Sequence, residues 1–208
     1  MPAPLQSINA RGTLRGMQLE SSVRILIIDS HGQPVRWALL MRAARYYAAG
    51  KVVTDLGDNL FSMTGGLQER SGLRSEFVTS SIVMIRGRHR IPYGHAHVGL
   101  TKHRLFSRDR QICAYCAQAH PESELTVEHI LPVSRGGRQT WTNVVTACRR
   151  CNQFKGSRTL TQCGLELLAL PYTPNMAEYL ALVNGRRIRG DQMEFLRAQF
   201  PPCSRLRA

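Results

Sequence analysis

Two pairs of cysteines carry the clearest chemistry in the sequence. Each pair has the spacing C-x-x-C, Cys113 with Cys116 and Cys148 with Cys151. In such a turn both thiolates can face one metal ion, and two turns together supply the four sulfur ligands of a tetrahedral zinc site. A site closed by four sulfurs leaves no position for a substrate, so the sequence predicts a structural Zn²⁺ ion.

Disulfide bonds are the competing interpretation of these cysteines. The first residues of the chain lack the apolar core of a signal peptide, so an oxidising compartment is not indicated. A redox-active C-x-x-C motif would not come in duplicate. Cys163 and Cys203 have no partner at this spacing and are interpreted as ordinary thiols.

Polar residues between and just after the cysteine pairs have side chains suited to phosphodiester hydrolysis. This reaction needs a base for the attacking water and a cation for the departing oxygen. The imidazole of His129 titrates near neutral pH and can be that base. Glu128 and Asn152 offer oxygen ligands to a divalent ion such as Mg²⁺ or Mn²⁺. Neighbouring strand residues point to opposite faces, so Glu128 and His129 would approach the phosphate from different directions.

From Cys113 to Gly156 the sequence resembles the HNH endonuclease family in the order and spacing of its motif residues. The shared pattern is C-x-x-C, an acid followed by His-Ile-x-Pro, Gly-Gly, Asn, a second C-x-x-C followed by Asn, and Lys. The resemblance implies a ββα-metal (HNH, or His-Me finger) fold, in which a β-hairpin and a helix surround one catalytic metal. It also implies a DNA endonuclease that leaves 5′-phosphate and 3′-hydroxyl ends, with Asn143 holding the loop that carries His129.

Two positions depart from the family pattern. The usual aspartate is Glu128, which is one methylene longer, and the third letter of the motif, often histidine, is Asn152. Both side chains are compatible with metal binding, and asparagine suits Mg²⁺ or Mn²⁺ more than zinc. An ordinary ion pair between Glu128 and a nearby arginine is the alternative interpretation.

The charge of the chain favours a polyanionic partner. Its 208 residues include 28 Lys and Arg against 14 Asp and Glu, a formal charge of +14, and only three of these cations are lysines. Arginine suits bidentate contact with phosphate, although a GC-rich genome would also favour arginine over lysine. The expected partner is DNA rather than RNA. The residues expected to contact it are Arg135, Arg138, Arg149, Arg150, Lys155 and Arg158.

A non-catalytic, zinc-stapled module that only binds nucleic acid is the rival prediction. It would keep the same cysteines and basic residues without cleavage. The other six histidines receive no role in either prediction, and Trp141 is expected in a core.

The elements around these motifs predict an α+β protein in three parts. Residues 1–100 would form a small α/β unit, 101–160 the nuclease module, and 161–208 a helical tail. Strands are predicted at 23–29, 52–53, 77–85, 125–128 and 144–146, and helices at 35–49, 149–155, 176–183 and 191–199. Gly65 and Gly66 are predicted to break the stretch before residue 77. Residues 86–110 are interpreted as a basic linker, or alternatively as a solvated charged face.

The first part resembles the family only weakly. Residues 25–51 and the Arg108-Asp109 pair are similar to the region that precedes the module in one bacterial branch of the family. The sequence leaves open whether this part supplies sequence specificity or a homodimer contact. No apolar run is long enough to span a bilayer, so a cytoplasmic protein is expected.

Overall fold

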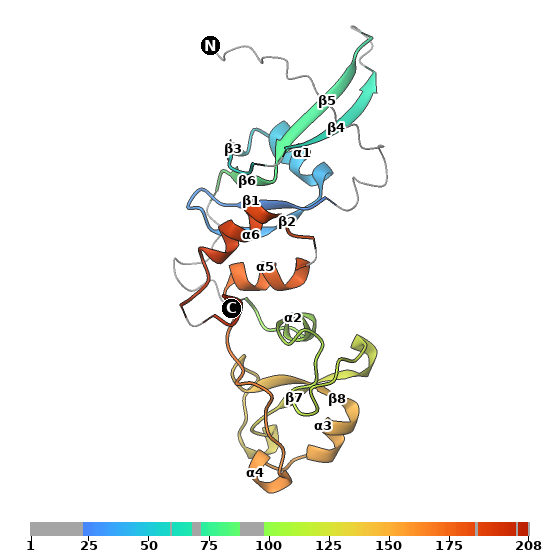
Figure 1. Ribbon diagram of the computed structural model, residues 1–208, viewed down its shortest axis with the longest axis vertical. Coiled ribbons are helices and arrows are strands. Elements are labelled where there is room, and N and C mark those ends of the chain that lie inside the picture. The colour runs from blue at the N-terminus through green and yellow to red at the C-terminus, as the bar shows by residue number, and fades with distance from the viewer. Residues whose placement is uncertain are drawn as a thin grey trace.

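The fold is that of a computed structural model, which describes residues 23–58, 60–67, 72–87, 98–185, 187–202 and 204–207. Figure 1 shows an elongated molecule with a sheet and its helices in the upper half and a smaller part with strands β7 and β8 at the lower end. Residues 88–97 of the predicted basic linker lie outside the described residues, and so does Cys203. That part of the linker includes three of the histidines without an assigned role, at positions 89, 95 and 97. None of the helices in the described ranges has the length and apolarity needed to cross a membrane.

A four-stranded sheet forms the centre of the upper half. Its strands are β1 (Ile25–Ile28), β2 (Pro34–Ala38), β3 (Val52–Asp55) and β6 (Ile82–Ile85), in the order β2-β1-β6-β3. Strand β1 runs antiparallel to β2 and parallel to β6. All four residues of β1 are fully buried, as expected for a continuous apolar run covered on both faces.

Helices cover both faces of this sheet. Ile25 and Ile27 share a core with helix α1 (Leu40–Ala48). Leu26 and Ile28, which point to the other face, pack with residues of α5 (Met176–Asn184) and α6 (Gly190–Arg197). The two C-terminal helices lie within two residues of their predicted bounds, and they complete the core of the N-terminal sheet.

The prediction of a helix over residues 35–49 is wrong in its first part. Residues Pro34–Ala38 form strand β2, which pairs with β1, and the helix begins only at Leu40. Strand β2 lies at the edge of the sheet, where a proline costs no ladder hydrogen bond. The indole of Trp37 donates to the backbone oxygen of Leu180 at 2.9 Å, so a contact distant in sequence fixes this strand.

The prediction of one strand over residues 77–85 is also wrong. The chain bends at Ser81, so that β5 (Arg74–Ser80) and β6 are separate strands. The stretch containing Gly65 and Gly66 is not a break but belongs to β4 (Leu60–Leu67), which pairs with β5 as an antiparallel ribbon. A Cβ at Gly65 would lie 2.2 Å from Oγ of Ser75, so glycine leaves room for this serine side chain on the neighbouring strand.

A second antiparallel pair forms the lower part of the molecule. Strand β7 (Leu125–His129) pairs with β8 (Val144–Cys148), and helix α3 (Arg149–Lys155) follows directly. Helix α2 (Lys102–Arg108) precedes them, and the short helix α4 (Leu160–Cys163) follows. The buried residues Phe106, Leu125 and Trp141 form the core here, which confirms the expected burial of Trp141.

Arg108 joins several of these segments from a buried position. Its guanidinium makes a bidentate ion pair with Asp109 and donates to the backbone oxygens of Trp141, Val144 and Tyr172. Asp109 in turn accepts from the backbone N–H of Thr146 at 2.8 Å. Arg108 therefore stabilises buried contacts between these segments and does not belong to a solvated basic linker.

Candidate active site

The four motif cysteines converge at one end of the β7–β8 pair. Cys148 ends β8 and Cys151 lies in the first turn of α3, while Cys113 and Cys116 come from the segment after α2. Their sulfur atoms all lie within 4.8 Å of one another. Four zinc–sulfur bonds of about 2.3 Å in a tetrahedron require sulfurs roughly 3.8 Å apart, so small side-chain movements suffice. The cluster could hold a metal ion such as zinc.

The acidity of these thiols differs within the cluster. Burial raises the pKa of Cys113, but hydrogen bonds from the backbone, including those from Cys116 and Cys148, outweigh it and lower the pKa to about 7. Burial raises the pKa of Cys151 far above its ordinary value. Because thiolates are the metal ligands, binding of zinc has to displace protons from the cluster.

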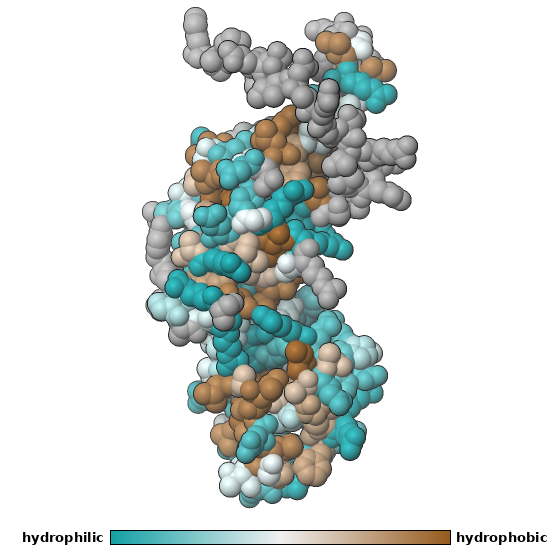
Figure 2. Space-filling model, in the orientation of Figure 1, coloured by the Kyte–Doolittle hydropathy of each residue, from teal (hydrophilic) through white to brown (hydrophobic). Residues whose placement is uncertain are grey.

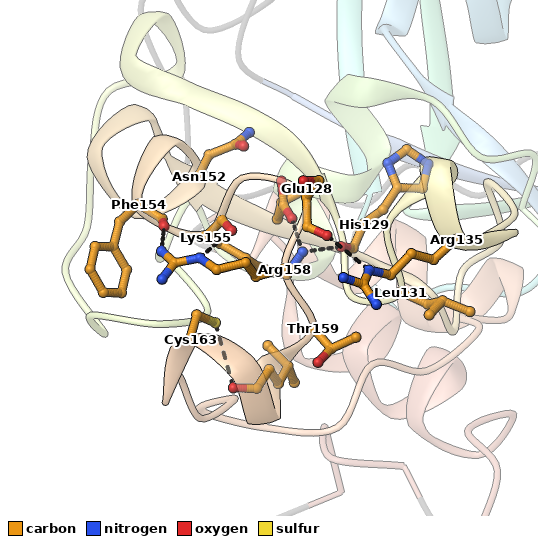
Figure 3. Close-up of polar contacts among 12 residues, drawn as sticks. Glu128, His129, Leu131, Arg135, Asn152, Phe154, Lys155, Arg158, Thr159 and Cys163 are labelled. Carbon is orange, nitrogen blue, oxygen red and sulfur yellow. Dashed lines mark hydrogen bonds and ion pairs between the residues drawn. The ribbon is translucent and has the colours of Figure 1, made fainter.

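Glu128 is paired with a lysine rather than an arginine. The ammonium of Lys155 lies 2.5 Å from Oε1 of Glu128 and 2.7 Å from the backbone oxygen of His129 (Figure 3). Lys155 is fully buried and Glu128 is 6% exposed. Lys155, which the sequence placed on the DNA-facing surface, is therefore inside the protein and ties α3 to β7.

Asn152 lies on α3 beside the same strand. Its Nδ2 donates to Oγ1 of Thr126 at 2.8 Å, and Thr126 and Glu128 stand on the same face of β7 because they are two residues apart. Among the described groups, none donates to Oε2 of Glu128 or to Oδ1 of Asn152. These two oxygens are hard donors on adjacent elements, and they could hold a divalent ion.

His129 ends β7 and is half-buried. Figure 3 shows its imidazole turned away from Glu128 and Lys155, as alternation along a strand requires. No described residue makes a side-chain hydrogen bond to this ring, so its nitrogens are available to water.

Asn143 fastens the loop that follows His129. Its Oδ1 accepts from the backbone N–H of Leu131 at 2.9 Å, and its Nδ2 donates to the backbone oxygens of Leu131 and Arg138. The same loop passes so close to Gly137 that a Cβ there would lie 1.8 Å from the oxygen of Leu131. Only glycine fits this position, and the loop is fixed from both sides.

The remaining residues predicted to contact DNA are exposed. They are Arg135, Arg138, Arg149, Arg150 and Arg158. Three of them are oriented by the backbone, since Arg135 donates to Ser157, Arg149 to Ser123, and Arg158 to Phe154 and Lys155. The guanidinium carbon of Arg158 also lies 4.9 Å from the ring centroid of Phe154, which is itself 54% exposed.

One residue and one contact of this region were missed by the sequence analysis. Thr126 orients Asn152, and its position two residues before Glu128 on a predicted strand was a usable signal. The ion pair of Lys155 had no such signal, because it depends on how α3 packs across β7.

Lys155→Met is expected to destabilise the protein by about 3–5 kcal/mol, because a buried carboxylate loses its cation. For a chain of this size that corresponds to a fall in Tm of roughly 6–20 °C in a thermal melt. Arg150→Met, an exposed position on the same helix, is the matched control and should change stability by less than about 0.5 kcal/mol. The double variant Glu128→Gln/Lys155→Met should recover part of the loss; equal melting of Lys155→Met and Arg150→Met would contradict the ion pair.

Comparison with known families supplies an independent identification. Residues 113–168 match the profile of the HNH endonuclease family. A search of curated proteins finds no significant match to the chain. The chain thus carries a domain of the HNH endonuclease family over residues 113–168, and its four clustered cysteines fit the zinc-stapled type.

Proposed function

We propose that this protein is a metal-dependent DNA endonuclease that hydrolyses phosphodiester bonds with His129 as the general base. The observation that carries the proposal is the half-buried His129 imidazole, which lies within the matched HNH segment and has no described hydrogen-bond partner. The β7–β8 pair followed by α3 supports the proposal, because the ββα-metal fold implied by the family resemblance is also a β-hairpin followed by a helix.

His129 would take a proton from the attacking water, and the resulting hydroxide forms a bond to phosphorus as the bond to the 3′ oxygen breaks. The products are then a 5′-phosphate and a 3′-hydroxyl. Asn143 would act as a positioning residue, because its three hydrogen bonds fix the loop next to the base.

Glu128 and Asn152 would hold a Mg²⁺ or Mn²⁺ ion through their two oxygens without a described donor. Such an ion, when bound, supplies positive charge to a non-bridging phosphate oxygen and to the leaving oxygen. Lys155 holds the other oxygen of Glu128, so it would orient the carboxylate.

The zinc ion would be structural in this scheme. Cys151 and Asn152 are adjacent at the start of α3, and the backbone N–H of Cys151 donates to the sulfur of Cys148. A zinc ion bound by the cysteines would therefore fix the first turn of α3 and, with it, the position of Asn152.

DNA is the proposed partner of the exposed arginines on this domain. Arginine forks match phosphate oxygens, and the stretch from His129 to Leu165 contains no acid. We further propose that residues 101–160 act as the nuclease module. Residues 1–100 and 161–208 would form a supporting part, since α5 and α6 share a core with the N-terminal sheet. A homodimer and a cytoplasmic location stay predictions.

Cleavage of supercoiled plasmid tests this function. The purified protein is expected to convert plasmid to open-circular or linear DNA with Mg²⁺ or Mn²⁺, and to leave it intact with EDTA. Zinc content is measured in the same samples, so that loss of the structural ion is not mistaken for loss of the catalytic one. Plasmid that stays supercoiled under every metal condition would reject the proposed endonuclease activity.

The second candidate is a nucleic-acid-binding module without cleavage. The buried Lys155 favours it, because a cation already neutralises Glu128 and opposes a second cation. If this candidate is correct, the protein binds DNA with equal affinity in Mg²⁺ and in EDTA and cleaves it under neither condition.

A further inference from the structure

A large cavity lies on the side of the molecule formed by the C-terminal helices. Its volume is about 990 Å³, and it is bounded by the end of α5, by α6 and by the segment after α6. Apolar side chains contribute to its wall, among them Leu182, Met193 and Phe200. None of the residues of the proposed nuclease site lines it.

Five arginines surround this cavity. They are Arg24, Arg110, Arg187, Arg197 and Arg205. Among the described residues that line the cavity, none is acidic. The guanidinium of Arg205 donates to the backbone oxygen of Leu170 and stacks near Tyr172, so this side chain is held in place.

Three of the other arginines, Arg110, Arg187 and Arg197, are less constrained. Within the described ranges, no hydrogen bond or ion pair involves the guanidinium groups of Arg110, Arg187 and Arg197, and all three residues are exposed. Like charges gathered around one concave surface repel one another and attract an anion. Since arginine presents a planar fork of donors, the chemistry that fits is a phosphate or several phosphates in a row.

Arg110 connects this cavity to the HNH domain. It lies three residues before Cys113, and together with Arg205 it also lines a neighbouring cavity of about 260 Å³ next to Ala114 and Val145. Figure 2 shows hydrophilic side chains gathered around the C-terminal end of the chain, between the helical half and the lower domain. Arg110 and Arg205 therefore place two of the arginines of the large cavity next to the domain that would cut DNA.

We propose that this arginine-lined cavity binds backbone phosphates of DNA that flanks the cleavage site. This inference rests on the proposed function for the identity of the ligand. The arginines contact phosphates, and the apolar wall accepts the sugar edge of the strand. The N-terminal sheet and its C-terminal helices thereby form a second contact that lengthens the bound DNA without reading its bases.

The salt dependence of DNA binding tests the cavity. Fluorescence anisotropy with a labelled duplex in EDTA measures Kd at several salt concentrations for the full chain and for Arg187→Gln/Arg197→Gln. If two phosphate contacts are lost, the slope of log Kd against log salt falls by about 1.8. The matched control is Arg36→Gln/Arg74→Gln, which removes the same charge at two exposed positions that line no described cavity.

An unchanged slope in Arg187→Gln/Arg197→Gln, or an equal fall in the control, overturns the proposal. A free phosphate compound is the other source of the same chemistry, and calorimetric titration with tripolyphosphate distinguishes it. Tight binding of tripolyphosphate by the wild type, combined with an unchanged DNA slope in the cavity variant, would assign the cavity to such a compound and reject DNA.

The two proposals fail separately in this design. Binding is measured without divalent ions, so it does not depend on cleavage. A reduced slope in a protein that cuts no plasmid would reject the nuclease and leave the cavity assignment intact. Plasmid cleavage by the wild type, together with an unchanged slope in Arg187→Gln/Arg197→Gln, would reject the cavity assignment and leave the nuclease intact.

Discussion

His129→Ala is expected to reduce the rate of DNA cleavage by about 100- to 10,000-fold, because a positioned general base contributes a factor of that size. The side chain of His129 makes no described hydrogen bond, so its loss removes the base without leaving a buried partner unpaired. Thermal stability should therefore remain close to that of the wild type. The rate is measured on supercoiled plasmid with saturating Mg²⁺.

The matched control is His103→Ala. This histidine is exposed on α2, and the only described polar contact of its side chain is a 3.9 Å approach of Nδ1 to Glu122. Its removal should leave both cleavage and stability unchanged. DNA affinity in EDTA should also be the same for His129→Ala and the wild type. A His129→Ala protein that cuts plasmid as fast as His103→Ala would remove His129 from the mechanism.

The elements nearest the motif could be predicted closely from the sequence. Strand β7 was expected at residues 125–128 and lies at Leu125–His129, and α3 has the predicted bounds 149–155. Local signals determine both elements. The glycine pair and the second cysteine pair mark where the chain must turn, and strand alternation predicts which way Glu128 and His129 point.

The environment of Glu128 could not be predicted in this way. The sequence analysis considered an arginine as its alternative partner and assigned Lys155 to the surface. Lys155 is instead fully buried, because the last turn of α3 lies across β7. A helix of seven residues shows too little periodicity in its sequence to reveal which face is buried.

Predictions of secondary structure in the N-terminal half were wrong for a related reason. Residues 35–38 were predicted from local sequence to begin a helix, but pairing with β1 and the contact of Trp37 with α5 make them part of a strand. Likewise, the core of the sheet includes α5 and α6 from the far end of the chain. Contacts so distant in sequence override local propensity, and a single sequence does not display them.

Cys148→Ser is expected to abolish zinc binding and to unfold the HNH domain. Structural zinc sites in small peptides contribute about 10–16 kcal/mol at neutral pH, whereas the whole stability of a typical domain is about 5–15 kcal/mol. Loss of one of four ligands therefore outweighs what the small core around Phe106, Leu125 and Trp141 can supply. Cleavage should be lost as well, since Asn152 depends on the first turn of α3.

Amide hydrogen exchange measures which elements of Cys148→Ser lose their structure. In Cys148→Ser, protection should disappear from β7, β8 and α3. It should persist in β1 and β6, whose cores with α1, α5 and α6 contain none of the four cysteines. Cys163→Ser is the matched control, because this half-buried cysteine lies outside the cluster and its thiol donates to the backbone oxygen of Leu160. It should keep the zinc content and exchange pattern of the wild type.

Two results would contradict the structural role of the zinc site. A wild-type protein that is folded with no bound zinc, or a Cys148→Ser variant with full zinc content and normal exchange, would contradict the structural role of the cluster. Addition of a zinc chelator to the wild type gives an independent check, because it removes the ion without altering the chain. Chelation should reproduce the loss of protection in β7, β8 and α3, since the free energy of zinc binding is part of the free energy of folding.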